Sequence, residues 1–243
     1  LALGLPKDFT AEQVDALGAG LATDQATYGI SLYGGDTVRS PAGLTLSVTA
    51  IGEVREGGMV RRGGAQAGEV IVVTGTIGDA ALGLSLRLDP ALFGRLGLSD
   101  DHRDHLLDRY LLPRPRGALA LAVADCASGG MDISDGLVGD LGKMAAASGV
   151  AIEIDADRVP LSAAARAAVM ADPRLFAVAL TGGDDYELAL SIPASKVDAF
   201  LAIASAAGIE AAAIGRVRQG EGVAVLGDHP ALADLGSGSY RHF

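Results

Sequence analysis

Hydrophobic and polar residues alternate in two short segments near the start of this 243-residue chain. In residues 44–54 the apolar side chains of Leu44, Leu46 and Val48 fall on one face and hydroxyl side chains fall on the other, which predicts a half-buried strand. Residues 1–5 alternate in the same way, as an interior strand does. Because an alternating strand needs neighbours to bury its apolar face, we expect preceding sequence that this chain lacks.

The rest of the chain alternates apolar runs with helical patterns. Residues 69–74 form a near-continuous apolar run, typical of a buried strand, and a glycine turn and a helix over residues 79–88 follow it. Further strands are predicted at residues 30–33, 151–154, 186–192, 211–214 and 223–226. Further helices are predicted at residues 11–28, 100–112, 117–128, 137–148, 161–170 and 194–207. Helices that alternate with strands predict an α/β or α+β fold.

A segment rich in glycine and arginine, residues 55–68, interrupts these patterns. Such a segment is typical of a connection between domains. We therefore predict an N-terminal domain in residues 1–62 and a larger C-terminal domain in residues 63–243. The chain length suits two domains of modest size.

Composition and charge exclude several classes of function. With 19 basic and 30 acidic residues, the chain carries a net charge of −11, which repels a phosphate backbone and disfavours nucleic acid as a partner. No apolar run approaches the roughly 20 residues of a membrane span, so we expect no membrane partner. The single cysteine, Cys126, fits a reducing cytoplasm. A small anionic ligand would need metal ions to bridge it to so acidic a chain.

Two segments that combine carboxylates with glycines are the strongest candidates for chemistry: Met131–Leu137, which reads Met-Asp-Ile-Ser-Asp-Gly-Leu, and Gly182–Leu188, which reads Gly-Gly-Asp-Asp-Tyr-Glu-Leu. An ionised group is costly to bury unless a cation or a hydrogen-bond donor meets it. Carboxylates at this density among short apolar residues therefore indicate a partner for the charge.

The spacing in the first segment indicates a metal site. Asp132 and Asp135 stand three residues apart and can face one side if a helix begins at Gly136, where their oxygens would suit Mg²⁺ that carries a nucleotide. The alternative is helix capping, in which Ser134 or Asp135 accepts a hydrogen bond at the start of the following helix and no ligand is involved.

Three glycine turns are weaker signals. In Gly34–Arg39 the backbone N–H groups can meet a phosphate while Asp36 reaches a metal, although the same residues make ordinary turns. Arg61–Gly64 offers phosphate-pairing donors or is a solvated loop. The turn after residues 69–74 lacks the dinucleotide spacing, and Asp79 there serves the helix dipole better than it would a pyrophosphate. The sequence contains no P-loop motif.

Together these segments resemble the thiamine-monophosphate kinase family. The resemblance runs along the whole chain, and the shared order of so many short motifs is specific. The motifs are Gly34–Thr37 with Arg39 and Pro41, Arg62–Ala65, Val73–Gly75 with Gly78 and Asp79, Pro113–Arg116, Met131–Leu137, Gly182–Leu188 and Tyr240–Phe243.

The resemblance implies an aminoimidazole-ribotide-synthetase-like architecture. A ferredoxin-like N-terminal α/β domain, of which this chain would hold a part, pairs across a homodimer, and a C-terminal α/β domain folds against it. ATP and thiamine monophosphate would be the substrates, with several Mg²⁺ ions that bridge ATP to aspartates. A phosphate oxygen of thiamine monophosphate would attack the γ-phosphorus in line. Because that phosphate is already largely ionised near neutral pH, no protein nucleophile or general base is required.

The resemblance also assigns roles to residues of this sequence by their motifs. The residues expected to contact ATP are Gly35, Asp36, Arg62 and Ser134. The residues expected to hold metal are Asp36, Asp132 and Asp135. The residues expected to contact thiamine monophosphate are Asp184 and Tyr240.

One departure from the family keeps other interpretations open. Three aspartate-rich family segments would precede residue 1 and are absent, so we expect the chain as given to be catalytically incomplete. It could instead be another ATP-using member of the superfamily, such as a purine-pathway or selenophosphate synthetase, or a non-catalytic nucleotide-binding subunit. The segments Gly182–Leu188 and Tyr240–Phe243 favour the thiamine enzyme.

Overall fold

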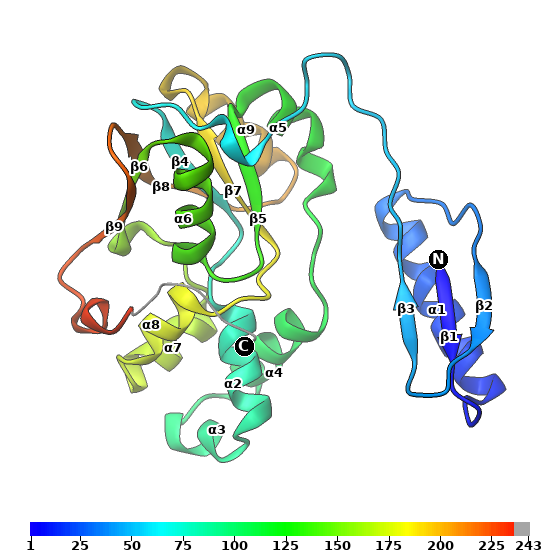
Figure 1. Ribbon diagram of the computed structural model, residues 1–243. Helices are drawn as coiled ribbons and strands as arrows, with labels where there is room; N and C mark the ends of the chain where they lie inside the picture. Colours follow the sequence, from blue (N-terminus) through cyan, green and yellow to red (C-terminus); the bar gives the residue numbers. More distant parts are fainter. Residues whose placement is uncertain (236–243) are drawn as a thin grey trace. The chain divides into compact units, whose positions relative to one another are not determined.

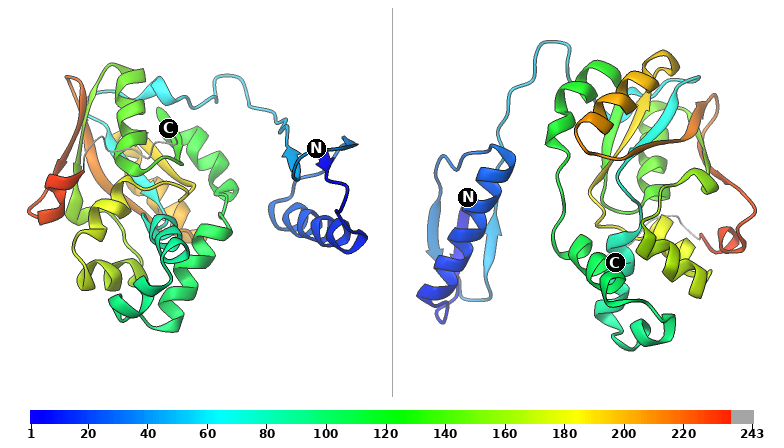
Figure 2. Two further views of the ribbon diagram at one scale, coloured as in Figure 1. Left: turned by 60° about the horizontal axis from the view of Figure 1, so that its bottom comes forward. Right: turned by 180° about the vertical axis from the view of Figure 1, so that it is seen from behind.

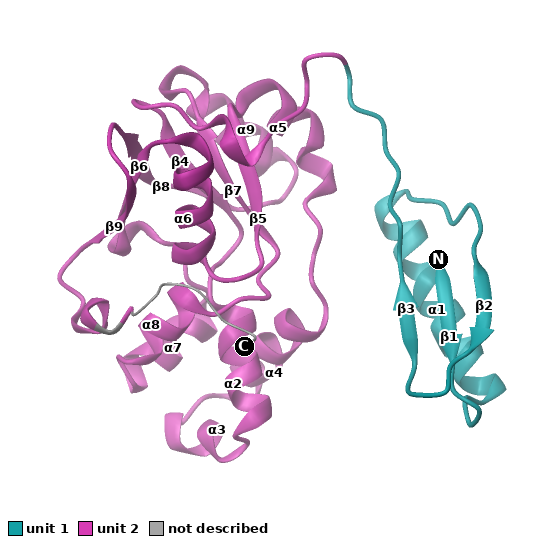
Figure 3. Ribbon diagram, in the orientation of Figure 1, with its two compact units in different colours: residues 1–55 teal, residues 56–243 magenta. Residues whose placement is uncertain are grey.

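The computed structural model describes residues 1–235 of the chain, which divides into two compact units (Figure 1). The first unit comprises residues 1–55 and the second comprises residues 56–243 (Figure 3). Residues 56–62, which we had assigned to the N-terminal domain, thus fall in the second unit. The end of this segment is tied to the second unit, because Arg61 forms a parallel β-bridge with Gly129.

The first unit is a three-stranded sheet with one helix. Strand β1 (Ala2–Leu5) lies between β2 (Asp36–Arg39), to which it runs parallel, and β3 (Thr45–Ser47), to which it runs antiparallel. Helix α1 (Ala11–Tyr28) makes the crossover from β1 to β2, as a parallel pair requires. The helix begins with a capping box between Thr10 and Gln13.

Two predictions in this unit were wrong. Residues 30–33 form no strand, and in residues 44–54 only β3 is a strand. The expected burial is also absent, because Leu46 is 43% exposed and Val48 is 73% exposed. The physical reason is that an alternating strand is buried only under a second layer, and no residue of 1–55 is buried within this unit.

The second unit is built on a six-stranded sheet in the order β5-β7-β4-β8-β6-β9. Neighbouring strands are antiparallel except β6 and β9, which run parallel. The strands are β4 (Val70–Thr74), β5 (Gly129–Ile133), β6 (Ala151–Asp155), β7 (Glu187–Ile192), β8 (Ala211–Arg218) and β9 (Gly222–Leu226).

Helices cover this sheet in separate groups (Figure 2). On one face α6 and α8 pack over a core that contains Ile71, Ile152 and Ile214, and on the other α5 and α9 pack over Val72 and Leu190. A third cluster joins α2, α4 and α7 at one end. The α-helices are α2 (Asp79–Leu88), α3 (Ala91–Leu96), α4 (Asp100–Leu111), α5 (Ala120–Cys126), α6 (Leu137–Ser148), α7 (Ala163–Ala171), α8 (Leu175–Thr181) and α9 (Val197–Ala206). The short 3₁₀ helices are η1 (Arg62–Gly64), η2 (Gly117–Leu119), η3 (Ala156–Arg158), η4 (Ala194–Lys196) and η5 (Pro230–Asp234).

The predicted fold class is confirmed: the second unit layers helices on both faces of a sheet. Strands β4, β6, β7 and β9 and helices α2, α4 and α6 lie where the hydrophobic pattern placed them. The pattern missed β5, α3 and α8. Within residues 1–235, none of the helices has the length and apolar composition needed to cross a membrane.

Candidate functional site

The two acidic segments meet at one end of the six-stranded sheet. Strands β5 and β7 pair so that Ile133 lies opposite Glu187, which places the loop after β5 beside the loop before β7. Two backbone hydrogen bonds join the loops: the N–H of Tyr186 donates to the carbonyl of Ile133 at 2.8 Å, and the N–H of Asp184 donates to the carbonyl of Ser134 at 2.9 Å. Gly183 permits this contact, because a Cβ there would collide with the Ser134 carbonyl.

Within the second segment, side chains alternate between the interior and the surface. Asp185 and Glu187 are buried, whereas Tyr186 is 40% exposed and Asp184 is partly exposed. Asp184 and Tyr186 hold left-handed backbone conformations, with φ of 69° and 49°. Such conformations are strained for a bulky residue and persist where the surroundings impose them, often at functional sites.

The charges of three carboxylates act on the Tyr186 side chain. Its hydroxyl donates to Asp184 Oδ1 at 3.4 Å. Burial raises the pKa of Tyr186, and the negative charges of Asp184, Asp132 and Asp135 raise it further. The charges of Asp132 and Asp135, from the first segment, and of Asp184, from the second, therefore all act on the Tyr186 hydroxyl.

A buried carboxylate on α6 holds the loop after β5. Asp140 Oδ2 accepts hydrogen bonds from the N–H groups of Ser134 at 2.9 Å and Asp135 at 2.8 Å. Lys143 donates to Asp140 Oδ1 at 2.7 Å and also to Asp135 Oδ2. Partial burial of Lys143 opposes its charge, but the bonds to the two carboxylates outweigh this and raise its pKa.

The capping alternative for Ser134 and Asp135 is not what the structure contains. The N-cap of α6 is Gly136, and no side chain makes a cap hydrogen bond there. Asp140, from inside the first turn, satisfies the preceding amides instead. The side chains of Ser134 and Asp135 are thus not committed to capping, and Asp135 pairs with Lys143 instead.

Asp185 occupies the helix N-terminus that a phosphate would have needed in a dinucleotide site. Its carboxylate accepts from the N–H of Gly78 at 2.7 Å and of Ala80 at 3.2 Å, at the start of α2. Asp79 turns away and accepts from Thr76 and from Ser162, and His105 Nε2 lies 3.1 Å from its Oδ2. The end of α2 is therefore filled by the protein's own carboxylate.

Asp185 is expected to make stability fall as pH rises from about 4 to about 8. Burial raises its pKa from 3.8 to about 8; the Gly78 and Ala80 amides oppose this shift and the Asp79 charge adds to it. In that pH range the unfolded chain has lost the proton that the folded chain retains, so each pH unit costs up to about 1.4 kcal/mol. Below the range both states bind the proton, and above it neither does.

Chemical denaturation at about pH 5 and pH 7 measures this slope. The variant Asp185→Asn is neutral at both pH values and should lose the contribution. An equal pH slope in the variant and in the parent protein would contradict the assignment to Asp185.

The last buried group of the segment, Glu187, anchors two arginines. Arg109 Nη2 donates to Glu187 Oε1 at 2.8 Å, Arg116 Nε donates to Oε2 at 2.6 Å, and Thr74 Oγ1 donates to Oε2 at 2.8 Å. Arg109 also donates to the carbonyl of Asp185 at 3.3 Å. This cluster ties the segment to β4, α4 and the Pro-Arg-Pro-Arg turn. The buried residues of the segment therefore hold its exposed residues in place.

The exposed carboxylates fit a metal that arrives with a nucleotide better than a metal held by the chain alone. Among residues 1–235 no three histidine, cysteine, aspartate or glutamate side chains are grouped closely enough to hold an ion. In the same range the Asp132 carboxylate has no hydrogen bond, and Asp135 is balanced by Lys143. Mg²⁺ commonly takes only one or two protein carboxylates and completes its shell with water and phosphate oxygens, which this donor set permits.

The other predicted site residues lie elsewhere. Gly35 and Asp36 belong to the first unit, where Gly35 packs against the Leu1 carbonyl and Asp36 Oδ1 accepts from the Thr37 N–H at 2.8 Å. Arg62 lies in η1, beside the end of α6, where its carbonyl accepts from Ser148. This is the opposite end of α6 from Ser134, so the structure does not bring Arg62 to the loops. Tyr240 lies outside the described residues.

The sequence reasoning missed the residues that support the loops. Asp140 and Lys143 carried a usable signal, because an acid and a base three residues apart on a helix form a pair, and an acid in the first turn can meet preceding amides. Arg116 stood in a motif that carried the family resemblance, but its partner Glu187 is 71 residues away in the sequence. No local pattern reveals such a pair.

Comparison with known proteins shows the relationship. Residues 66–228 match the family described as AIR synthase related protein, C-terminal domain. The chain is 36% identical over 226 residues to the thiamine-monophosphate kinase of Caulobacter vibrioides, a match that covers 92% of this chain and 62% of that protein. The chain thus spans less than two thirds of that curated relative's length, and about half of the Salmonella typhimurium relative's length.

Solved structures agree. The crystal structure of thiamine-monophosphate kinase from Stenotrophomonas maltophilia is 40% identical and superimposes with a TM-score of 0.84, covering 94% of this chain and 71% of that one. A structure described as AaThiL complexed with AMPPCP and TMP is 28% identical, with a TM-score of 0.76, and covers all of this chain and 72% of that one. On its sequence, its fold and the two loops at the end of its sheet, the chain belongs to the thiamine-monophosphate kinase family.

Proposed function

We propose that the protein transfers the γ-phosphoryl group of ATP to thiamine monophosphate, which yields thiamine diphosphate and ADP. The observation that carries the proposal is the meeting of the two acidic segments in a chain of this family, where the N–H groups of Tyr186 and Asp184 donate to the carbonyls of Ile133 and Ser134. The family member described as complexed with AMPPCP and TMP supports both substrates, since AMPPCP is an ATP analogue.

The proposed reaction forms one bond and breaks one. A terminal phosphate oxygen of thiamine monophosphate bonds to the γ-phosphorus of ATP while the bond from that phosphorus to the β,γ-bridging oxygen breaks, and ADP leaves with the electron pair. The protein supplies no nucleophile. Its contribution is to hold two anions in line and to offset their charge, which can account for most of the barrier reduction in phosphoryl transfer.

Asp132 and Asp135 would hold Mg²⁺ that arrives with ATP. When bound, the ion supplies the positive charge that lets two phosphate groups approach within an acidic protein. In the ligand-free chain Lys143 provides part of that charge at Asp135, and Asp140 keeps Ser134 and Asp135 oriented by their amides. The loop is thereby arranged before the ligand binds.

The remaining assignments are also part of the proposal. Gly35, Asp36, Arg62 and Ser134 contact ATP, Asp36 adds a metal ligand, and Asp184 and Tyr240 contact thiamine monophosphate. For Asp184 the support is its partly exposed carboxylate at the loop surface, which can offset the cationic thiazolium ring or accept from the aminopyrimidine. An aromatic ring such as that of Tyr240 can pack against either heterocycle.

We further propose a cytoplasmic homodimer that forms through the first unit. The support is the apolar surface of that unit, where Val38, Val48 and Ile51 are 58%, 73% and 93% exposed. Large apolar side chains exposed at this density are typical of a protein–protein interface. The unpaired Cys126 suits a reducing compartment.

The test is formation of thiamine diphosphate from ATP and thiamine monophosphate by the purified full-length protein, in which the variants are also made. Asp184→Ala is expected to raise KM for thiamine monophosphate by about tenfold or more while KM for ATP stays within about twofold, because one carboxylate contact to the cationic substrate is lost. Tyr240→Ala should act in the same direction. Asp172→Ala, which removes an aspartate on the loop between α7 and α8, is the control. Equal shifts of both KM values would show that the substrate pocket does not include Asp184. Absence of the product would overturn the proposed reaction.

A further inference from the structure

The face of the six-stranded sheet that carries α5 and α9 is covered unevenly. The buried cluster on this face draws its strand residues from β4 and β7, including Val72, Leu190 and Ile192, and ends toward β8. Beyond that point, the side chains of β8 and β6 on this face are exposed or partly exposed. Because the opposite face is sealed by α6, α8 and η5, the uncovered half is a feature of one face only.

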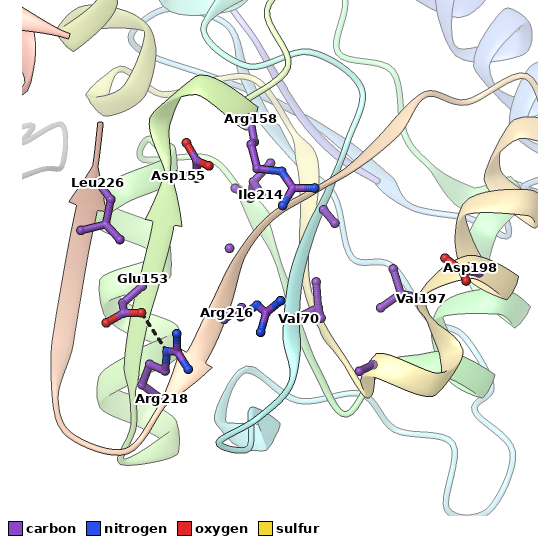
Figure 4. Close-up of a pocket in the computed structure, with 13 residues that line it drawn as sticks. Val70, Glu153, Asp155, Arg158, Val197, Asp198, Ile214, Arg216, Arg218 and Leu226 are labelled. Atoms are coloured by element: carbon purple, nitrogen blue, oxygen red, sulfur yellow. Dashed lines mark hydrogen bonds and ion pairs between the residues drawn. The ribbon is translucent and has the colours of Figure 1, made fainter. Parts of the chain in front are cut away.

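A groove of about 390 Å³ lies between this uncovered half and the beginning of α9 (Figure 4). Its apolar surface comes from Val70, Val197 and Leu226, while Ile214 only borders it, because the Ile214 side chain is fully buried in the core on the other face. The volume falls in the range of roughly 300–1,000 Å³ that is usual for small-molecule sites. The groove lies on the face opposite α6, whereas the loop after β5 in the proposed kinase site leads into α6 and is held by Asp140 of that helix.

Six charged side chains line the groove, three arginines and three acids, but they are not all paired with one another. They are Glu153, Asp155, Arg158, Asp198, Arg216 and Arg218. Glu153 Oε2 accepts from Arg218 Nε at 2.8 Å. Asp155 Oδ1 accepts from the Asp157 N–H at 3.1 Å and caps η3. Asp198 stands on α9, on the far wall of the groove (Figure 4).

Arg158 and Arg216 remain without an anionic partner. Within residues 1–235 neither guanidinium forms a hydrogen bond or an ion pair, although Arg216 lies directly across from Glu153 in the β6–β8 register. Figure 4 shows Arg158 near Ile214 and Arg216 farther along the strand of Ile214, near Val70, so the two guanidinium groups border different parts of one groove. A guanidinium pairs well with phosphate or carboxylate oxygens, so each can meet an anion that enters the groove.

We propose that this groove binds a small organic anion, whose phosphate or carboxylate group pairs with Arg158 and Arg216 and whose apolar body lies against Val70 and Val197. In a chain of net charge −11, two unpaired arginines in one groove form a local site that attracts anions. Asp198 on the far wall favours a ligand that also carries a hydrogen-bond donor or a cationic group at its other end.

The experiment is an NMR titration of the ¹⁵N-labelled protein with three probes of one shape: phenyl phosphate, benzoate and phenol. Phenyl phosphate is expected to shift the amide signals of Val70, Val197 and Ile214 in a saturable manner, with an affinity at least about tenfold above that of phenol, because phenol lacks the anion. Benzoate separates the two anion classes: binding comparable to that of phenyl phosphate assigns a general anion site, and much weaker binding assigns a phosphate site.

Three variants test the residues. Arg158→Gln and Arg216→Gln should each weaken phenyl phosphate binding by about tenfold, and the double variant should abolish it. Arg87→Gln removes an exposed arginine of α2 outside the groove and should leave the affinity within about twofold. Because both groove arginines are exposed, the variants should fold, which their amide spectra verify.

Two results would overturn the proposal. One is the absence of saturable shifts in the parent protein up to about 10 mM phenyl phosphate, which would leave the groove as an uncovered protein-docking face or a solvated surface. The other is an unchanged affinity in the double variant, which would place the anion elsewhere. Neither result depends on kinase activity, so the proposal stands or fails independently of the proposed reaction.

Discussion

Substitution of Glu187 by alanine is expected to lower the free energy of unfolding by about 3–5 kcal/mol. The Glu187 side chain is fully buried and joins Arg109, Arg116 and Thr74. Its removal leaves Arg109, which is 5% exposed, as a buried cation without its carboxylate. Removing one member of a buried charged group is costly mainly because of the charge that stays behind.

Urea denaturation monitored by circular dichroism measures this loss. Glu153→Ala is the matched control, since it removes a glutamate that pairs with Arg218 at 2.8 Å on the surface. The Arg218 side chain is 54% exposed and the Glu153 side chain is 38% exposed. That substitution should cost less than about 1 kcal/mol. A similar cost for the two variants would show that the buried group contributes no more than a surface pair.

Asp132→Asn is expected to lower turnover by about 100-fold or more while the melting temperature changes by only a few degrees. The substitution preserves the shape of the side chain and removes its charge. The Asp132 side chain is exposed and makes no hydrogen bond within residues 1–235, so the fold does not depend on its carboxylate. Asp101→Asn, an exposed aspartate on α4, is the control and should leave turnover unchanged.

The same variant separates a metal role from a structural role. ATP binding measured by calorimetry should require Mg²⁺ in the parent protein, because aspartates and a net charge of −11 repel the bare nucleotide. In Asp132→Asn this Mg²⁺ dependence should weaken. Equal ATP affinity in excess chelator, or outright unfolding of the variant, would contradict the assignment of Asp132 to the metal.

The elements of the second unit that depend on local pattern were predictable. β4 is an unbroken apolar run, and α6 carries apolar residues at helical spacing, so both follow from burial. β5 was not predictable, because Gly129 and Gly130 have little intrinsic preference for a strand. It is a strand because β7 pairs with it along its length. α8 was missed because a seven-residue apolar run does not distinguish a helix from a strand.

In the first unit, residues 44–54 alternate as described, but the burial predicted from that alternation is absent. Alternation states which side chains share a face, but burial requires a second layer, and residues 1–55 do not provide one within the unit. A pattern of this kind therefore predicts which side chains share a face, whereas the neighbouring layers determine whether that face is buried.

By itself, the sequence determined the fold class, the family and the two segments that approach each other, because hydrophobic period and motif order are local properties. Only the tertiary structure decided which carboxylates are available. Of the five acids in the two segments, Asp185 and Glu187 are satisfied by the Gly78 and Ala80 amides and by Arg109 and Arg116, whereas Asp132 is exposed and Asp135 and Asp184 are partly exposed. The state of a carboxylate depends on the donors around it, and here those donors lie 71 to 107 residues away in the sequence.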